Sequence, residues 1–224
     1  MAAVDAPLTY RERPASGDAD GLLILHHGRG AHEHDLLPLA DILDPAGRLH
    51  VVTPRAPLSL ANAPGYHWYV VPRVGYPDAP TFHAAYRQLG AFHDELWRRL
   101  GIPPERTVLG GFSMGTVMSY ALGLGPERPP PAGILALSGF IPVVDGFEPD
   151  LSPPLPPVAI GHGTLDPVIS VEFGRRARAI LEEAGADVLY RESPIPHTID
   201  PRYLTELQGW VRDAVDRAAV GEAQ

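Results

Sequence analysis

Seven short apolar runs, each bounded by turn residues, recur along the chain and predict the strands of a sheet. Their length, aliphatic content and lack of polar alternation are typical of strands buried on both faces, as in a parallel sheet covered by helices. The runs are LTYRE (8–12), GLLILHH (21–27), LHVVTP (49–54), TVLGGF (107–112), GILALS (133–138), PVAIGH (157–162) and DVLYRE (187–192).

Helical patterns fill the intervals between these runs. The clearest spans residues 82–100, where apolar side chains recur at steps of three and four and build one stripe. Further helices are expected near 35–44, 114–124, 170–184 and 201–219. The last has a strong start signal, because Asp200 is a good N-cap and Pro201 suits the first helical position. The alternation predicts an α/β protein, a three-layer α/β/α sandwich with a mostly parallel central sheet of about seven strands.

Three stretches, 55–80, 125–131 and 139–157, lack a strong pattern. Ligands bind beyond the carboxyl ends of the strands in open α/β sheets, so we expect the first and third stretches to wall a pocket. We see no internal repeat and no domain boundary. Residues 1–224 are therefore predicted to form a single domain, with poorly ordered ends at about 1–6 and 220–224.

Charge and composition exclude several classes of function. The net charge of −9 argues against binding nucleic acid and against stable membrane association, because both call for clustered positive charge. The chain has no cysteine, which excludes disulfides, thiolate metal sites and a cysteine nucleophile. The N-terminus carries acids and lacks the continuous apolar region of a signal peptide, and no run is long enough to span a membrane. We expect a cytoplasmic protein, and a homodimer stays open.

The stretch Gly111-Phe112-Ser113-Met114-Gly115 matches G-x-S-x-G between a predicted strand and a predicted helix. In such a turn a serine nucleophile takes an unfavourable backbone conformation, and glycines two residues away avoid collisions. The helix that follows directs free N–H groups at charge developing near Ser113. The alternative is that Ser113 is an ordinary N-cap, so the partners must decide.

A serine hydroxyl needs a base and an acid that orients the base, and in this chain order both follow the serine, the acid first. His162 and His197 are the only histidines downstream. His197 is favoured because it lies in a loop after the last strand, whereas His162 at a strand end is more typical of a structural histidine. Asp166 is the expected acid, because it follows a strand and precedes a helix. The alternative is that it is an ordinary turn aspartate before Pro167. The remaining downstream aspartates are placed less well: Asp145, Asp150, Asp187 and Asp200.

An oxyanion needs two donors. The backbone N–H of Met114 supplies one, and the loop 25–35 supplies the other at Arg29 or a neighbour, since Gly28 and Gly30 let the backbone bend toward a ligand. A dinucleotide fingerprint fails here because Glu33 occupies the third glycine position. The spacing of the loop histidines, His26, His27, His32 and His34, matches no standard metal site, and no metal is expected.

Four segments together resemble the phospholipase/carboxylesterase family of α/β hydrolases, which includes small bacterial carboxylesterases and acyl-protein thioesterases. The first, LHHGRGAHEHDLLPLA, resembles the family's H-G-x-G-x-x-x-x-D loop. The others are TPRAP with the later HWYVV, the elbow LGGFSMG, and GHGTLDPVIS with a later loop histidine. The resemblance implies the triad Ser113, Asp166 and His197, oxyanion donors at Arg29 and Met114, and hydrolysis of esters or thioesters without metal or organic cofactor.

The expected activity is hydrolysis of small carboxylic esters with short- to medium-chain acyl groups through an acyl-enzyme on Ser113. Trp68, Tyr69, Phe140 and Phe147 are the candidates for the acyl pocket, and ordinary loop packing is their other reading. The alternatives are a lysophospholipase or acyl thioesterase, and a small-molecule-binding protein on the same scaffold. The chain departs from the family at Met114, where Gln is common, at Pro196, where Gly precedes the base, and at Arg29, where many relatives are apolar.

Overall fold

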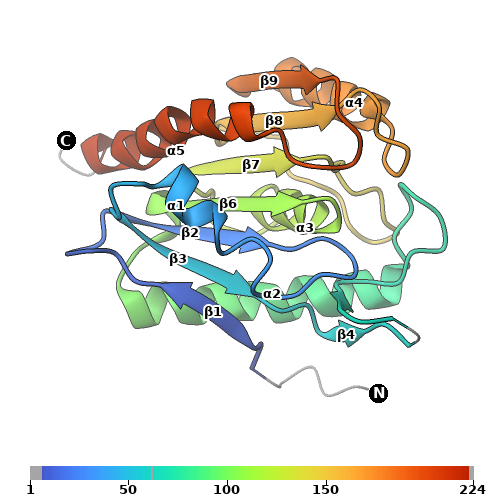
Figure 1. Cartoon of the computed structure of the whole chain (residues 1–224), viewed down its shortest axis with the longest axis horizontal. Helices are drawn as coiled ribbons and strands as arrows, with labels where there is room; N and C mark the ends of the chain where they lie inside the picture. Colours follow the sequence, from blue (N-terminus) through green and yellow to red (C-terminus); the bar gives the residue numbers. More distant parts are fainter. Residues whose placement is uncertain (1–6, 62, 222–224) are drawn as a thin grey trace.

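The computed structural model describes residues 7–61 and 63–221, and it is built around one seven-stranded sheet (Figure 1). The strand order is β1-β3-β2-β6-β7-β8-β9, and every neighbouring pair is parallel except β1 with β3. The strands are β1 (Tyr10–Arg13), β2 (Gly21–His26), β3 (Leu49–Pro54), β6 (Thr107–Phe112), β7 (Gly133–Leu137), β8 (Val158–Gly163) and β9 (Val188–Ser193). The predicted mostly parallel α/β sheet is confirmed.

Helices cover both faces of this sheet. On one face lie α2 (Ala79–Leu100), α3 (Met114–Gly123) and α4 (Val171–Glu183), and on the other lie α1 (Leu39–Leu43) and α5 (Pro201–Gly221) (Figure 1). Each face has its own buried apolar cluster, so the sheet is the middle layer of the predicted sandwich.

Burial on both faces holds for the central strands only. Every residue of β2, β7 and β8 is buried, whereas β1 and β9 are largely half-buried or exposed. These two strands are the edges of the sheet, and β1 is antiparallel, so the expectation of seven doubly buried strands was wrong for them.

The longest helix shows how local signals set its bounds. Asp78 caps α2 by accepting a hydrogen bond from the backbone N–H of Thr81, and a proline stands in the first turn. Gly101 ends the helix at φ 65°, a left-handed conformation that glycine adopts without strain. The apolar stripe packs against the sheet, and the helix begins three residues before the predicted stripe.

A small hairpin occupies part of the stretch 55–80, for which we predicted no element. It consists of β4 (Leu58–Ser59) and β5 (Tyr66–His67), and a 3-10 turn, η1 (Pro104–Arg106), precedes β6. The carbonyl of Tyr66 accepts a hydrogen bond from the backbone N–H of Gly30, at 2.8 Å. The hairpin therefore holds the loop that follows β2.

The chain ends were expected to be poorly ordered. Residues 1–6 and 222–224 lie outside the described residues, and α5 runs to Gly221. None of the helices within 7–61 and 63–221 is both long and apolar enough to cross a membrane.

Candidate active site

Ser113 stands on a strained turn between β6 and α3. Its backbone has φ 57° and ψ −118°, a conformation that side chains rarely adopt. A Cβ on Gly111 would lie 2.4 Å from the backbone carbon of Gly115, and a Cβ on Gly115 would lie 1.8 Å from the carbonyl oxygen of His26. No side chain fits at either glycine, so the G-x-S-x-G spacing is a steric requirement of this turn.

The turn brings three sequence-predicted residues into one hydrogen-bonded chain. His197 Nε2 lies 2.9 Å from Ser113 Oγ, and His197 Nδ1 lies 2.6 Å from Asp166 Oδ2. Asp166 follows β8, and His197 lies in the loop between β9 and α5. Both residues therefore lie beyond the carboxyl ends of neighbouring strands. The imidazole is partly exposed, with 17% of its side chain accessible, whereas the Asp166 carboxylate is fully covered.

The surroundings of Asp166 keep its carboxylate ionised. Burial raises the pKa of Asp166, but hydrogen bonds from His197 and from the backbone N–H groups of Ile169 and Val168 outweigh it, so the pKa lies below its usual value. A carboxylate can only accept, so His197 Nδ1 carries the proton. The Nε2 lone pair then faces Ser113 Oγ and can accept the hydroxyl proton.

The alternative base, His162, is placed differently. It is 3% exposed, and its Nε2 donates to the carbonyl oxygen of Ile169 at 2.9 Å. Burial lowers the pKa of His162, which keeps the ring neutral beneath the acid loop, 3.7 Å from Asp166. His162 therefore holds the loop that carries Asp166, through the carbonyl of Ile169, and makes no hydrogen bond to Ser113.

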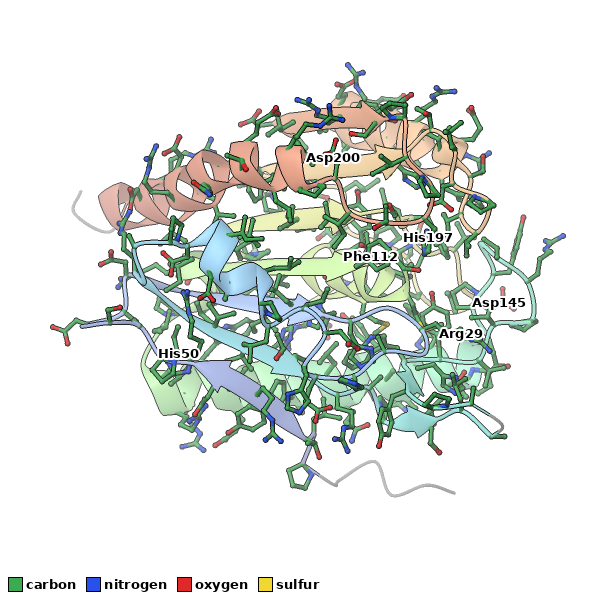
Figure 2. All side chains as sticks on the ribbon, in the orientation of Figure 1. Arg29, His50, Phe112, Asp145, His197 and Asp200 are labelled. Atoms are coloured by element: carbon green, nitrogen blue, oxygen red, sulfur yellow. The ribbon has the colours of Figure 1, made fainter. Side chains whose placement is uncertain are left out.

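The other candidate acids point elsewhere. Asp150 accepts from the backbone N–H of Ser152, and Asp187 pairs with Arg217. Asp145 lies at the same end of the sheet as His197 (Figure 2), and its backbone carbonyl bonds to His83. Asp200 accepts from the Ser193 hydroxyl and from the backbone N–H of Arg202 in the first turn of α5, as expected of a helix cap.

The loop after β2 lies directly against the nucleophile. A Cβ on Gly28 would lie 3.3 Å from Phe112 Cδ1 and 3.4 Å from Ser113 Cβ, so the loop packs closely on the elbow. Met114 is the first residue of α3, and within 7–61 and 63–221 neither its N–H nor that of Arg29 has a hydrogen-bond acceptor. Both N–H groups are therefore free to donate, as the donors of an oxyanion must be.

His27 and Trp68 fix the backbone of this loop. His27 Nε2 accepts from the backbone N–H of Ala56, so its Nδ1–H donates to the carbonyl of Gly28 at 2.7 Å. Trp68 is fully buried, and its indole N–H donates to the carbonyl of His27 at 2.9 Å. Trp68 was predicted for the acyl pocket, and in the structure it braces the loop.

The other three predicted pocket residues are also packed. Tyr69 and Phe147 both contact Phe82 of α2, with ring centroids 5.8 and 5.3 Å apart. Phe140 follows β7, and its ring is tilted against that of Phe173 at the start of α4, with centroids 5.2 Å apart. All three belong to the apolar cluster on the α2 side of the sheet, and their exposed fractions are 8% or less.

Sequence reasoning missed Phe112, the second residue of the elbow motif. Its ring packs on the imidazole of His197 with centroids 4.8 Å apart, and the two side chains adjoin at the carboxyl ends of the strands (Figure 2). The motif allows any residue at this position, so only the structure shows that Phe112 packs against the proposed base.

Beneath the elbow lies a buried polar chain that the sequence also did not reveal. Ser119 Oγ donates to the carbonyl of Gly115 at 3.0 Å, so His26 Nδ1–H donates to Ser119 Oγ at 2.8 Å. His26 Nε2 then accepts from His93 Nε2, at 3.1 Å. Both imidazoles are fully buried and neutral, because burial lowers the pKa of His26 to about 3 and that of His93 well below its usual value.

Because the pKa values of these two histidines are lowered in the folded protein, we expect the protein to lose stability on mild acidification. In the unfolded chain both bind protons below about pH 6.5, whereas in the folded protein neither does until far lower pH, so their stabilising effect is complete above that value and declines below it. The two together should lower the free energy of unfolding by roughly 2–3 kcal/mol per pH unit between pH 6 and 5, measured by urea denaturation. The lowered pKa values of His27, His67 and His162 act in the same direction and steepen the fall.

The variant His93→Gln provides the comparison for this prediction. It removes one titrating group, so its slope over the same interval should be smaller by about 1.4 kcal/mol per pH unit. Equal slopes in the two proteins would show that His93 takes up its proton while folded. Carboxylates with lowered pKa contribute at lower pH, outside this interval.

The remaining loop histidines do not join His26 and His27. His32 and His34 are exposed, and the described residues contain no group of three or more His, Cys, Asp or Glu side chains that could hold a metal ion. His34 accepts a hydrogen bond from Arg11.

The chain is similar in sequence and fold to several known proteins. A family model described as phospholipase/carboxylesterase matches residues 13–214. Esterase PE8 is 30% identical, with a TM-score of 0.79 over 93% of this chain and 100% of that chain. The Bacillus cereus carboxylesterase is 23% identical and shares the fold, with a TM-score of 0.81 over 94% and 96%. Acyl-protein thioesterase 1 of Candida albicans is 26% identical over 225 residues, 91% of this chain and 96% of that protein.

Proposed function

Since the chain belongs to the phospholipase/carboxylesterase family of α/β hydrolases, an esterase and thioesterase group, we propose that it hydrolyses carboxylic esters through an acyl-enzyme on Ser113. The observation that supports this most is the chain of hydrogen bonds from Ser113 Oγ through His197 to the ionised Asp166. Residues 1–224 act as a single domain in this proposal.

The proposed reaction begins with attack of Ser113 Oγ on the carbonyl carbon, while its proton passes to His197 Nε2. Asp166 stabilises the imidazolium that forms. The carbonyl oxygen becomes an oxyanion between the N–H groups of Arg29 and Met114. The C–O bond to the alcohol then breaks as His197 returns the proton to the leaving oxygen, and the acyl group stays on Ser113.

Deacylation repeats these steps with water. His197 takes a proton from the water molecule that attacks the acyl carbon, and the Ser113 oxygen leaves with that proton. The same residues would cleave a thioester, whose thiolate leaves more readily, and the acyl-protein thioesterase relative favours this second activity. We propose short- to medium-chain acyl groups as substrates, since Arg29, one of the two proposed oxyanion donors, has a charged side chain where a long acyl chain calls for an apolar one.

Two measurements test the proposal. Hydrolysis rates of 4-nitrophenyl esters from acetyl to palmitoyl should peak at the shorter chains. A fluorophosphonate probe should lose fluoride and form one covalent bond to the protein, and peptide mass spectrometry should place it on Ser113. A probe bound at another residue, or no turnover of any ester and of the matching thioesters, would refute the acyl-enzyme.

A further inference from the structure

Arg29 carries a positive charge on the loop that packs against Ser113. Gly28, the preceding residue, packs on Ser113, and Gly30, the next one, is bonded to Tyr66 of the hairpin. The backbone of Arg29 is thus held on both sides, while its side chain is exposed. Figure 2 shows Arg29 and His197 at the same end of the sheet, whereas His50 lies toward the other end.

No group among the described residues neutralises this charge. In the described part of the chain, Arg29 forms no ion pair, hydrogen bond or contact with an aromatic ring, although the protein is strongly acidic. The acids of its own loop are committed elsewhere. Glu33 is 1% exposed and binds Arg55 through both oxygens at 2.6 Å, and Asp35 accepts from the backbone N–H of His32.

The field of Arg29 reaches the hairpin that supports the loop. Burial and then the charge of Arg29 lower the pKa of His67, so this neighbour stays neutral and adds no second charge. The guanidinium is therefore a cation with no partner among the described residues, on the loop beside the proposed nucleophile, and its planar donors suit a carboxylate.

We propose that Arg29 recognises a carboxylate carried by the substrate close to the scissile ester, so that the preferred substrates are anionic esters. The inference rests on the proposed function and narrows it. The backbone N–H of Arg29 binds the oxyanion, while its side chain selects the charge. Anionic substrates gain from this pairing, and neutral esters of the same size do not.

The test compares matched pairs of substrates with the carboxylate on either side of the ester. On the acyl side, mono-4-nitrophenyl glutarate is compared with 4-nitrophenyl valerate. On the alcohol side, the acetyl ester of 4-hydroxybenzoate is compared with that of 4-hydroxybenzamide. The readout is the ratio of kcat/KM for the anionic and the neutral member, so any shared effect on the backbone donor cancels.

In Arg29→Gln this ratio should fall by roughly three- to tenfold in at least one of the two arms, as expected for a partly exposed charge pair, and the responding arm places the carboxylate. Arg29→Lys should retain part of the preference. Arg176→Gln is the matched control, because Arg176 is exposed on α4, has no ion pair within the described residues and carries the same charge. Its ratio should equal that of the wild type.

Equal ratios for the wild type and Arg29→Gln in both arms would overturn the inference. Calorimetric titration with glutarate against valerate, and with 4-hydroxybenzoate against 4-hydroxybenzamide, decides it without turnover. In at least one pair the wild type should bind the member with the additional carboxylate more tightly than Arg29→Gln does. Failure to hydrolyse the neutral esters would count against the proposed function, while the titration would still decide the role of Arg29.

Discussion

Replacement of Ser113 by alanine is expected to lower kcat for a neutral ester by about 10⁵- to 10⁶-fold, because the change removes the atom that forms the acyl-enzyme. The fold should survive. The Ser113 side chain makes one hydrogen bond, to His197, and alanine has the same Cβ in the strained turn. Steady-state rates on 4-nitrophenyl butyrate and circular dichroism measure the two outcomes.

The matched control is Ser16→Ala. Ser16 is an exposed serine whose backbone N–H bonds to Gly47 near the start of β3, and its replacement should leave kcat unchanged. Turnover by Ser113→Ala within tenfold of the wild type would mean that another group attacks the ester. Ser113 would then be a helix cap with an unusual backbone.

Replacement of Asp166 by asparagine should lower kcat by about 10⁴-fold. Asparagine can keep its oxygen at the Oδ1 position, where Asp166 accepts from the N–H groups of Val168 and Ile169. Its amide nitrogen then faces His197 Nδ1 and donates to it, so the imidazole proton moves to Nε2. The base thereby loses the lone pair that should receive the Ser113 proton.

Asp187→Asn serves as the control for this variant, since Asp187 is exposed and pairs only with Arg217 among the described residues. The two variants should unfold at similar urea concentrations and differ in kcat. Full activity in Asp166→Asn would transfer the role of acid to another residue, and the rate of each aspartate variant would then identify it.

Much of the fold was predictable because the buried strands are short continuous apolar runs, whereas the helices repeat apolar residues at steps of three and four. The run TVLGGF matches β6 residue for residue, and the pair Asp200-Pro201 placed the start of α5 correctly. The candidate nucleophile, acid and base were also identified by motif and chain order, and the structure brings Ser113, Asp166 and His197 within hydrogen-bond distance.

The residues that sequence reasoning missed have roles set by contacts between distant segments. His26, His93 and Ser119 come from three elements, and nothing in their local sequence shows that they share one buried chain. The hairpin of β4 and β5 has two residues in each strand, too few for a periodic signal. The position of Trp68 in the stretch 55–80 pointed to a ligand pocket, whereas its indole bonds to the backbone of the loop after β2.

The loops that carry the acid and the base are joined to each other more firmly than to the nucleophile. The backbone N–H groups of Thr164 and Leu165 donate to the carbonyls of Ser193 and Ile195, and the Ser193 hydroxyl closes the second loop onto Asp200. The two loops are linked to the serine elbow by the hydrogen bond between Ser113 Oγ and His197 Nε2. A substitution that displaces the elbow would therefore change the distance between base and nucleophile first, while Asp166 and His197 stay paired.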